Sequence, residues 1–316
     1  MLKQRIIDSH SHIGIDNTWN LAGSLSEYIS KASKIGITES FLMPVPMPII
    51  GIGRYKVIPI AIGSDGENDY IVQGVENQKE IRGIPVAQNP YQYANTILYQ
   101  KIVTYKEADI KLHFVPLIHP LFDTIEYLEQ LIIFYEPVAL KLHGYSSIIS
   151  PKEISYEFWK LIHFYDIPLI IHTDCDTSDS ELTIDTFYRN ENSPLNWIQI
   201  LEKYSIRAYL THGVRLCKKS CKIVNNSSNF VVGIGPDALL SNCKDRMYSN
   251  KPYLETLFSS IDISKLCFDL DYPWNVVSYD NHELEWDSLD RIKALGLTDF
   301  ELKQVLYENS KTFFNL

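Results

Sequence analysis

The sequence has few cysteines and lacks both a net positive charge and a long apolar run, and each lack excludes a class of protein. The cysteines number five and include no C-x-x-C pair, so we expect free thiols and no disulfide framework. No stretch approaches about 18 uncharged apolar residues, so no transmembrane helix is expected. The N-terminus has no apolar core of a signal peptide, and we therefore expect a cytoplasmic protein.

The charge balance argues against polyanionic partners. Lys and Arg together number 29 against 39 Asp and Glu, which gives a net charge of −10. Such a chain has no net attraction to phosphates, so we expect neither nucleic acid nor membrane as a partner. Hydrophobic residues make up 45% and charged residues 22%, which is ordinary for a globular protein and excludes a disordered chain or a coiled-coil rod.

Short apolar runs alternate with amphipathic stretches along most of the chain. The runs are apolar on both faces, as in parallel strands that are buried on both sides. Ser24 and Asp123 are placed to cap two of the intervening helices. Eight such runs predict a (β/α)8 TIM barrel, and a doubly wound open sheet is the alternative. The runs are 5–7, 39–43, 112–118, 138–142, 168–171, 207–210, 230–234 and 265–270.

Two segments exceed what a bare barrel needs, although we expect 1–316 to be a single domain. Residues 44–109 separate the second and third strands, and we interpret them as an insertion over the barrel mouth. A hairpin over 54–62 and a helix over 91–105 are expected within it. The C-terminal tail is expected to be helical, with helices beginning near Asp280 and at Thr298, which opens a capping-box pattern.

Polar side chains stand where the apolar runs end. His10 and His12 close the first run and are two residues apart, so a strand would point both to one side. His143, His172, His212 and Asp271 each follow a later run in the same way. In a TIM barrel these strand ends meet at one rim, where the active sites of this fold lie. The pattern therefore predicts a shared metal site.

These motifs, taken together, resemble the metal-dependent amidohydrolase superfamily, in the branch that includes aminocarboxymuconate-semialdehyde decarboxylase. The resemblance spans nearly the whole chain apart from 44–109. It lies in Ile7-Asp8-Ser9-His10-Ser11-His12, Leu140-Lys141-Leu142-His143, Ile170-Ile171-His172-Thr173, Leu210-Thr211-His212-Gly213 and Asp271-Tyr272-Pro273-Trp274.

The resemblance implies a set of roles for these residues. The metal ligands would be His10, His12, His172 and Asp271, with His212 beside the metal in contact with substrate or water. Imidazole and carboxylate ligands suit Zn²⁺, with Mn²⁺ or Fe²⁺ as alternatives. Asp271 would take a proton from the attacking water and deliver it to the leaving group, so Asp271 and His212 are the expected catalytic residues.

The number of metal ions depends on Lys141. Lys141 and His143 share one face of their strand, so either can reach the site. A carboxylated Lys141 would bridge two metals, as in some relatives. Otherwise one metal per chain is expected, and Lys141 serves as a charge or a contact to a substrate carboxylate. Weaker candidates for substrate contact are Arg215, which can grip a carboxylate, and Tyr145 and Trp274, which follow strand ends.

Three functions fit these observations. The first is a metal-dependent hydrolase that cleaves a C–N or C–O bond of a small molecule, such as an amide, cyclic amide, lactone or ester. The second is a non-oxidative decarboxylase of a small organic acid with the same metal site. The third is a catalytically silent barrel that acts as a binding protein, for which a broken ligand set would be expected. A homodimer is the default expectation for its assembly.

Overall fold

The apolar runs form two sheets of mainly parallel strands. The computed structural model describes residues 5–16, 21–46, 61–64, 69–72, 78–81, 84–87, 89–105, 109–174, 189–235, 252–274 and 288–316. One sheet has the order β2-β1-β3-β8, with the short β2 (Leu21–Gly23) antiparallel to the end of β1. Its parallel members are β1 (Ile7–Asp16), β3 (Glu39–Pro44) and β8 (Lys111–Phe114).

The second sheet is entirely parallel and has the order β14-β13-β12-β11-β10-β9. This order follows the chain, unlike the reversed order of a doubly wound sheet. The strands are β9 (Leu117–Ile118), β10 (Leu140–Leu142), β11 (Leu169–Ile171), β12 (Ala208–Leu210), β13 (Phe230–Gly233) and β14 (Leu266–Cys267).

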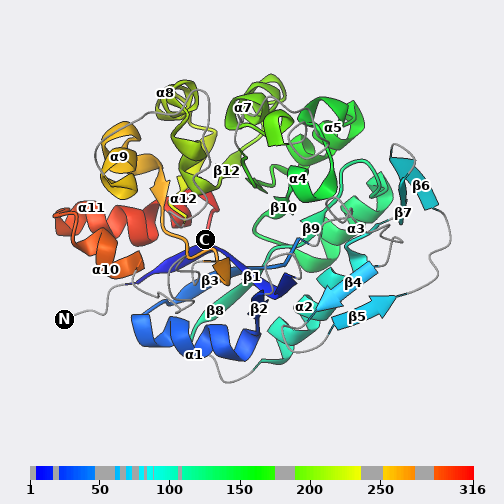
Figure 1. Cartoon of the computed structure of the whole chain (residues 1–316), viewed down its shortest axis with the longest axis horizontal. Coiled ribbons are helices and arrows are strands. Elements are labelled where there is room, and N and C mark those ends of the chain that lie inside the picture. Colours follow the sequence, from blue (N-terminus) through cyan, green and yellow to red (C-terminus); the bar gives the residue numbers. More distant parts are fainter. Residues whose placement is uncertain are drawn as a thin grey trace.

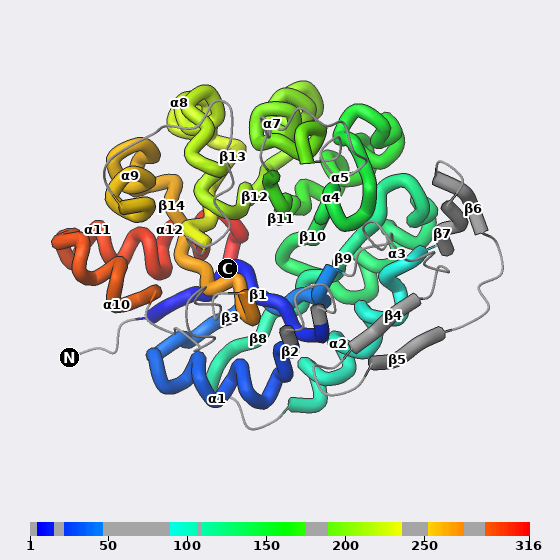
Figure 2. The backbone as a smooth tube through the Cα atoms, in the orientation of Figure 1, coloured from blue at the N-terminus to red at the C-terminus, as the bar shows by residue number. Residues whose placement is uncertain are grey.

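The two sheets are connected at both ends. Residues 111–118 supply β8 to one sheet and β9 to the other. At the other end, Ser9 N donates to Phe268 O at 3.1 Å and Asp271 N donates to His10 O at 2.8 Å. In Figure 2 the chain colours advance around the molecule until the orange β14 lies beside the blue β1. The architecture is therefore α/β and of the TIM-barrel type.

Helices cover the outside of the strands (Figure 1). Their apolar faces and the outward-facing strand residues form the larger core, which includes Leu42, Leu140, Trp159 and Trp197. Within the described ranges, no helix is both long and apolar enough to cross a bilayer. The helices are α1 (Leu25–Ile35), α2 (Gln92–Thr104), α3 (Ile125–Tyr135), α4 (Gly144–Ser147), α5 (Tyr156–Tyr165), α7 (Pro194–Lys203), α8 (Lys218–Asn226), α9 (Tyr253–Ser260), α10 (Ser288–Lys293), α11 (Asp299–Lys303) and α12 (Asn309–Phe313).

Two of the expected helix starts are confirmed and one is wrong. Ser24 accepts a hydrogen bond from Glu27 N and caps α1, and Thr298 forms a capping box with Glu301 at the start of α11. Asp123 does not cap α3. Thr124, one residue later, has the extended backbone of a cap and accepts from Tyr127 N. Asp123 instead accepts from His119 N at 2.7 Å.

The insertion and the tail are described in part. The described part of 44–109 contains α2, as expected, and two antiparallel strand pairs. The hairpin expected over 54–62 lies mostly outside the described residues, as does a helix start near Asp280. The described cysteines Cys217, Cys221 and Cys267 are free. The strand pairs are β4 (Ala61–Ser64) with β5 (Asp69–Val72) and β6 (Gln78–Ile81) with β7 (Ile84–Ala87).

The end of the chain packs against the inward-facing residues of the strands. Phe314 contacts Phe41, with 4.7 Å between ring centroids, and Tyr209, with 6.0 Å. These residues belong to a second, smaller core with Ile7 and Ile170. Figure 2 shows the C-terminus in the middle of the molecule. The tail therefore covers the strand end opposite to the predicted metal site.

Candidate metal centre

Two strands at the seam between the sheets bring together His10, His12 and Asp271, named here the His–His–Asp group. His10 and His12 lie in β1, and Asp271 lies beyond β14 and is held by its backbone hydrogen bond to His10 O. One ligand atom from each residue lies within 4.8 Å of the others, and all three residues are buried. This is the one such group of metal-ligating side chains among the described residues.

The protonation of His12 is set by a backbone carbonyl. Its Nδ1 lies 3.0 Å from Pro44 O, and because a carbonyl only accepts, Nδ1 must carry the proton. The lone pair of the neutral ring is then on Nε2. That Nε2 lies 3.0 Å from the Nε2 of His10. Two imidazole nitrogens bound to one zinc ion lie about 3.0–3.4 Å apart, given Zn–N bonds of about 2.0–2.1 Å, so the pair fits such an ion.

Electrostatics keep these histidines in the ligand form. Burial, followed by the charge of Lys141, lowers the pKa of His10 well below its ordinary value. Burial and the neighbouring His10 do the same for His12. Both rings are therefore neutral, as metal binding requires. Burial also raises the pKa of Asp271 well above its ordinary value, and Lys141 opposes that rise.

Two buried nitrogens at the site lack a hydrogen-bond acceptor within the part of the chain that the structure describes. They are Nδ1 of His10 and Nδ1 of His212. The first lies 3.5 Å from Asp271 Oδ1 and 3.6 Å from Asp269 Oδ2, and the second lies 3.7 Å from Asp271 Oδ2. Buried polar atoms rarely lack partners, and each of these two faces a carboxylate oxygen. The fit to a divalent ion rests on the Nε2 pair of His10 and His12 together with the Asp271 carboxylate.

Lys141 lies against the His–His–Asp group. It is fully buried on β10, and its Nζ is 2.7 Å from Nε2 of His10. Burial lowers the pKa of Lys141 to about 7, and the carboxylates of Asp271 and Asp269 oppose that fall. Both predicted roles, as a carboxylated bridge and as a substrate contact, stay open for this position. His143 accepts from Ser146 N through its Nδ1 at 3.2 Å and so caps α4.

His172 and His212 lie side by side. Nε2 of His212 is 3.0 Å from Nδ1 of His172, and the His172 ring stacks on His143 with 3.8 Å between centroids. His172 is thus connected to Asp271 through His212 and lies outside the His–His–Asp group. Its role as a ligand stays a prediction of the resemblance.

An unusual turn follows β12 and places His212. Residues His212–Leu216 (η2) all have positive φ, between 45° and 57°. Such a left-handed turn is rare for residues other than glycine. With about three residues per turn, His212 and Arg215 come to one side. The Arg215 Nη2 accordingly lies 3.4 Å from His172 Nε2, and its Nε donates to Thr173 O at 2.8 Å.

The remaining predicted residues occupy the edge of the site. The Trp274 ring packs edge-on against the His12 ring, with 4.9 Å between centroids. Tyr145 accepts from Arg189 Nη2 at 3.4 Å, and the Arg189 guanidinium also lies 4.7 Å from the Tyr145 ring centroid. The sequence gives no signal for Arg189, because it stands in a segment without strand or helix periodicity.

Sequence reasoning also missed two buried carboxylates. Asp269 lies beside His10 and accepts from the Tyr209 hydroxyl at 2.7 Å. Asp8 accepts from Leu270 N at 3.0 Å and from the Tyr28 hydroxyl at 2.5 Å, and so connects β1 to the segment after β14. The period-2 alternation of a strand gave a signal for Asp269, which shares a face with Asp271 two residues later.

Solved structures with this fold match nearly the whole chain. A protein from Pseudomonas putida described as a 2-pyrone-4,6-dicarboxylic acid hydrolase is 12% identical, with a TM-score of 0.58 over 100% of this chain and 98% of its own. The chain shares its fold with this protein. An amidohydrolase from Burkholderia multivorans with bound zinc is 9% identical, with a TM-score of 0.57 over 98% of this chain and 99% of its own.

A third structure is 4-oxalomesaconate hydratase from Rhodopseudomonas palustris, at 12% identity and a TM-score of 0.58, covering 98% of this chain and 95% of its own. The resemblance to amidohydrolases is therefore confirmed at the level of the fold. No family model matches the chain, and no curated protein matches its sequence.

Proposed function

We propose that this chain is a metal-dependent hydrolase that cleaves a C–N or C–O bond in an amide, cyclic amide, lactone or ester of a small molecule. The observation that carries the proposal is the buried His–His–Asp group, with its two neutral imidazole nitrogens 3.0 Å apart. His10, His12 and Asp271 would hold the ion, most simply Zn²⁺, with Mn²⁺ or Fe²⁺ as alternatives. A bound divalent ion would supply Lewis-acid chemistry and lower the pKa of water.

The chain's own residues supply the proton transfers. Asp271 Oδ1 lies 3.5 Å from His10 Nδ1 and 3.7 Å from His12 Nε2, and its Oδ2 lies 3.7 Å from His212 Nδ1. A carboxylate so placed can take a proton from an attacking water and later return it to the leaving group. His212 lies on the far side of Asp271 from β1 and would hydrogen-bond the substrate carbonyl. Burial of the whole group excludes bulk water, which strengthens these interactions.

Two buried basic side chains support a substrate that carries a negative charge. Lys141 is fully buried and Arg215 is 3% exposed, and both lie next to the site histidines. A buried guanidinium favours a bidentate contact with a carboxylate. The same feature favours decarboxylation of a small organic acid as the second candidate reaction, because the acid group would be held where the ion binds.

The first experiment is elemental analysis of protein purified without chelator. We expect about one zinc, manganese or iron per chain, and two if Lys141 is carboxylated. In His12→Asn the metal should be lost because a ligand is removed, whereas His163→Asn, on the exposed face of α5, should keep it. A wild-type protein without metal that also rebinds none would refute the proposal and favour the catalytically silent barrel.

Several properties stay predictions of the sequence. We propose that 1–316 is one domain and that the sheets close into one (β/α)8 barrel, which the backbone bonds between β1 and residues 268–271 support. The role of 44–109 as a cover for the mouth, the cytoplasmic location and the homodimer belong to the same set.

A further inference from the structure

Asp269 is a buried carboxylate beside the metal centre to which neither the sequence motifs nor the proposed reaction gives a role. We propose that Asp269 is a positioning residue that accepts a hydrogen bond from the Nδ1–H of His10. This bond keeps the Nε2 lone pair of the ring directed at the metal position. The proposal rests on the metal-dependent function proposed above.

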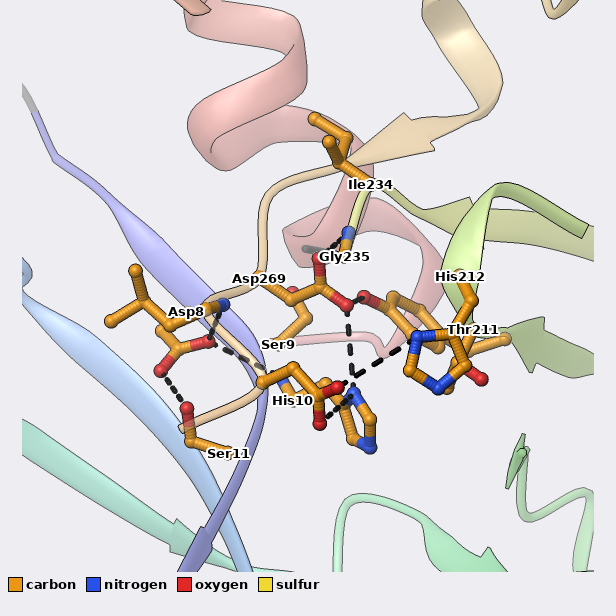
Figure 3. Close-up of polar contacts among 12 residues, drawn as sticks. Asp8, Ser9, His10, Ser11, Thr211, His212, Ile234, Gly235 and Asp269 are labelled. Carbon is orange, nitrogen blue, oxygen red and sulfur yellow. Dashed lines mark hydrogen bonds and ion pairs between the residues drawn. The ribbon is translucent and has the colours of Figure 1, made fainter. Parts of the chain in front are cut away.

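The position of Asp269 is fixed by two hydrogen bonds. Its Oδ2 accepts from the Tyr209 hydroxyl at 2.7 Å, and its Oδ1 accepts from Gly235 N at 2.5 Å. The side chain is fully buried, and its Oδ2 lies 3.6 Å from His10 Nδ1. Figure 3 shows Asp269 between Gly235 and His10. The carboxylate is therefore held in place by one donor on β12 and one just after the end of β13, and it faces the histidine.

His10 needs such an acceptor. A neutral imidazole has one proton, and a ring that binds a metal through Nε2 must carry it on Nδ1. The Nδ1 proton of His12 is accepted by Pro44 O. The Nδ1 of His10 is buried and forms no hydrogen bond to any described residue. Asp269 would do for His10 what the Pro44 carbonyl does for His12.

Asp271 lies slightly closer to this nitrogen than Asp269 but also faces other groups. Its Oδ1 lies 3.5 Å from His10 Nδ1 and also 3.7 Å from His12 Nε2, and its Oδ2 faces His212. Asp271 is thus committed to the ligand cluster. In this proposal Asp271 binds the ion, and Asp269 accepts the hydrogen bond from His10 Nδ1–H.

The backbone of β13 makes room for this arrangement. A Cβ at Gly233 would lie 2.2 Å from the Tyr209 hydroxyl and 2.5 Å from Asp269 Oδ2. Both distances are far below van der Waals contact, so a side chain at this position would displace the Tyr209–Asp269 pair. The absence of a side chain at Gly233 is what lets the pair reach His10.

The test measures zinc affinity and the His10 ring proton in the full-length protein. Zinc dissociation constants come from competition with a chelator, and ¹H–¹⁵N spectra of the zinc-loaded, ¹⁵N-histidine-labelled protein report the His10 Nδ1–H. For Asp269→Asn we expect zinc affinity to fall about 10–100-fold and the Nδ1–H resonance to move upfield, because an amide oxygen is a weaker acceptor than a carboxylate. Asp123→Asn, a buried carboxyl away from the ligands, is the matched control and should change neither.

A second variant guards against misfolding of the first. Tyr209→Phe keeps the ring and removes the hydroxyl that shares Asp269 Oδ2, so His10 should donate a stronger hydrogen bond to Asp269 and its Nδ1–H should move downfield. If the wild type binds zinc and Asp269→Asn keeps both the zinc affinity and the His10 Nδ1–H resonance of the wild type, the role of Asp269 is overturned. The proposed function would still stand. A shift in Asp271→Asn but not in Asp269→Asn would assign the role to Asp271. A wild type that binds no zinc would overturn both this inference and the proposed function.

Discussion

At the scale of single residues, the protein carries a buried carboxyl whose ionisation opposes folding. Burial raises the pKa of Asp123 to about 8, although a hydrogen bond from His119 N lowers it in part. Its Oδ1 has no hydrogen-bond partner among the described residues, and its charge also acts on the buried hydroxyls of Tyr91 and Tyr127. The folded state therefore holds this carboxyl protonated at pH values where the unfolded chain has released the proton.

The sign of the pH dependence follows from this difference. The folded pKa is raised above the ordinary value of 3.8, so the stabilisation is fully present below about pH 4 and is lost as the pH rises to about 8. We expect this group to lower the free energy of unfolding by up to about 1.4 kcal/mol per pH unit in that window. In Asp123→Asn this part of the pH dependence of the free energy of unfolding should be absent. Urea unfolding of the variant and the wild type from pH 4 to pH 8 measures it as the difference between the two proteins. Parallel curves for the two proteins would show that Asp123 is ionised in the folded state.

At the scale of elements, the left-handed turn η2 is the feature that shapes the site most. Gly213 has φ of +57°, and a Cβ there would lie 2.4 Å from the Tyr253 hydroxyl. Gly296 also has positive φ, of +75°, but has no atom within 4 Å of its Cβ position. Both substitutions to alanine introduce backbone strain of about 1–2 kcal/mol, but only Gly213→Ala adds a steric overlap.

We therefore expect Gly213→Ala to lower the free energy of unfolding by about 1 kcal/mol or more beyond the effect of Gly296→Ala. This difference is the low end of the usual cost of overpacking a core. Denaturant unfolding of the two variants measures the difference. His212 and Arg215 belong to the same turn, so zinc affinity should also fall in Gly213→Ala and stay unchanged in Gly296→Ala. Equal losses of stability would contradict the close packing of α9 against this turn.

The same elements show how far the sequence reaches. Strands that are apolar on both faces and end in His or Asp predicted the rim, because burial and the two-residue alternation act locally. Nothing in Val214, Arg215 or Leu216 indicates a positive φ, since that conformation is imposed by packing against α9 and β13. The cap of α3 was missed by one residue because Asp123 and Thr124 are both good capping residues, and tertiary contacts with His119 decided between them.

At the scale of the whole molecule, one end of the strands carries the candidate metal site and the other end carries part of the apolar core. His10 and His12 lie within β1 and Asp271 lies beyond the carboxyl end of β14, whereas Phe314 packs against Phe41 and Tyr209 on the side of the amino-terminal strand ends. In this fold, residues at the amino-terminal face serve stability and residues at the other face serve activity. Truncation of a buried apolar side chain at the amino-terminal face should therefore lower stability without changing metal binding.

Phe314→Ala should lower the free energy of unfolding by about 3–5 kcal/mol, because it leaves a cavity among buried rings. Phe300→Ala is the matched control: it removes the same side chain from a position that is 70% exposed, and its effect should stay within about 0.5 kcal/mol. Urea unfolding gives the stabilities, and elemental analysis of the folded fraction gives the metal content, which should equal that of the wild type in both variants. Metal loss in folded Phe314→Ala would mean that the tail also supports the ligands, most directly through Tyr209 and its hydrogen bond to Asp269.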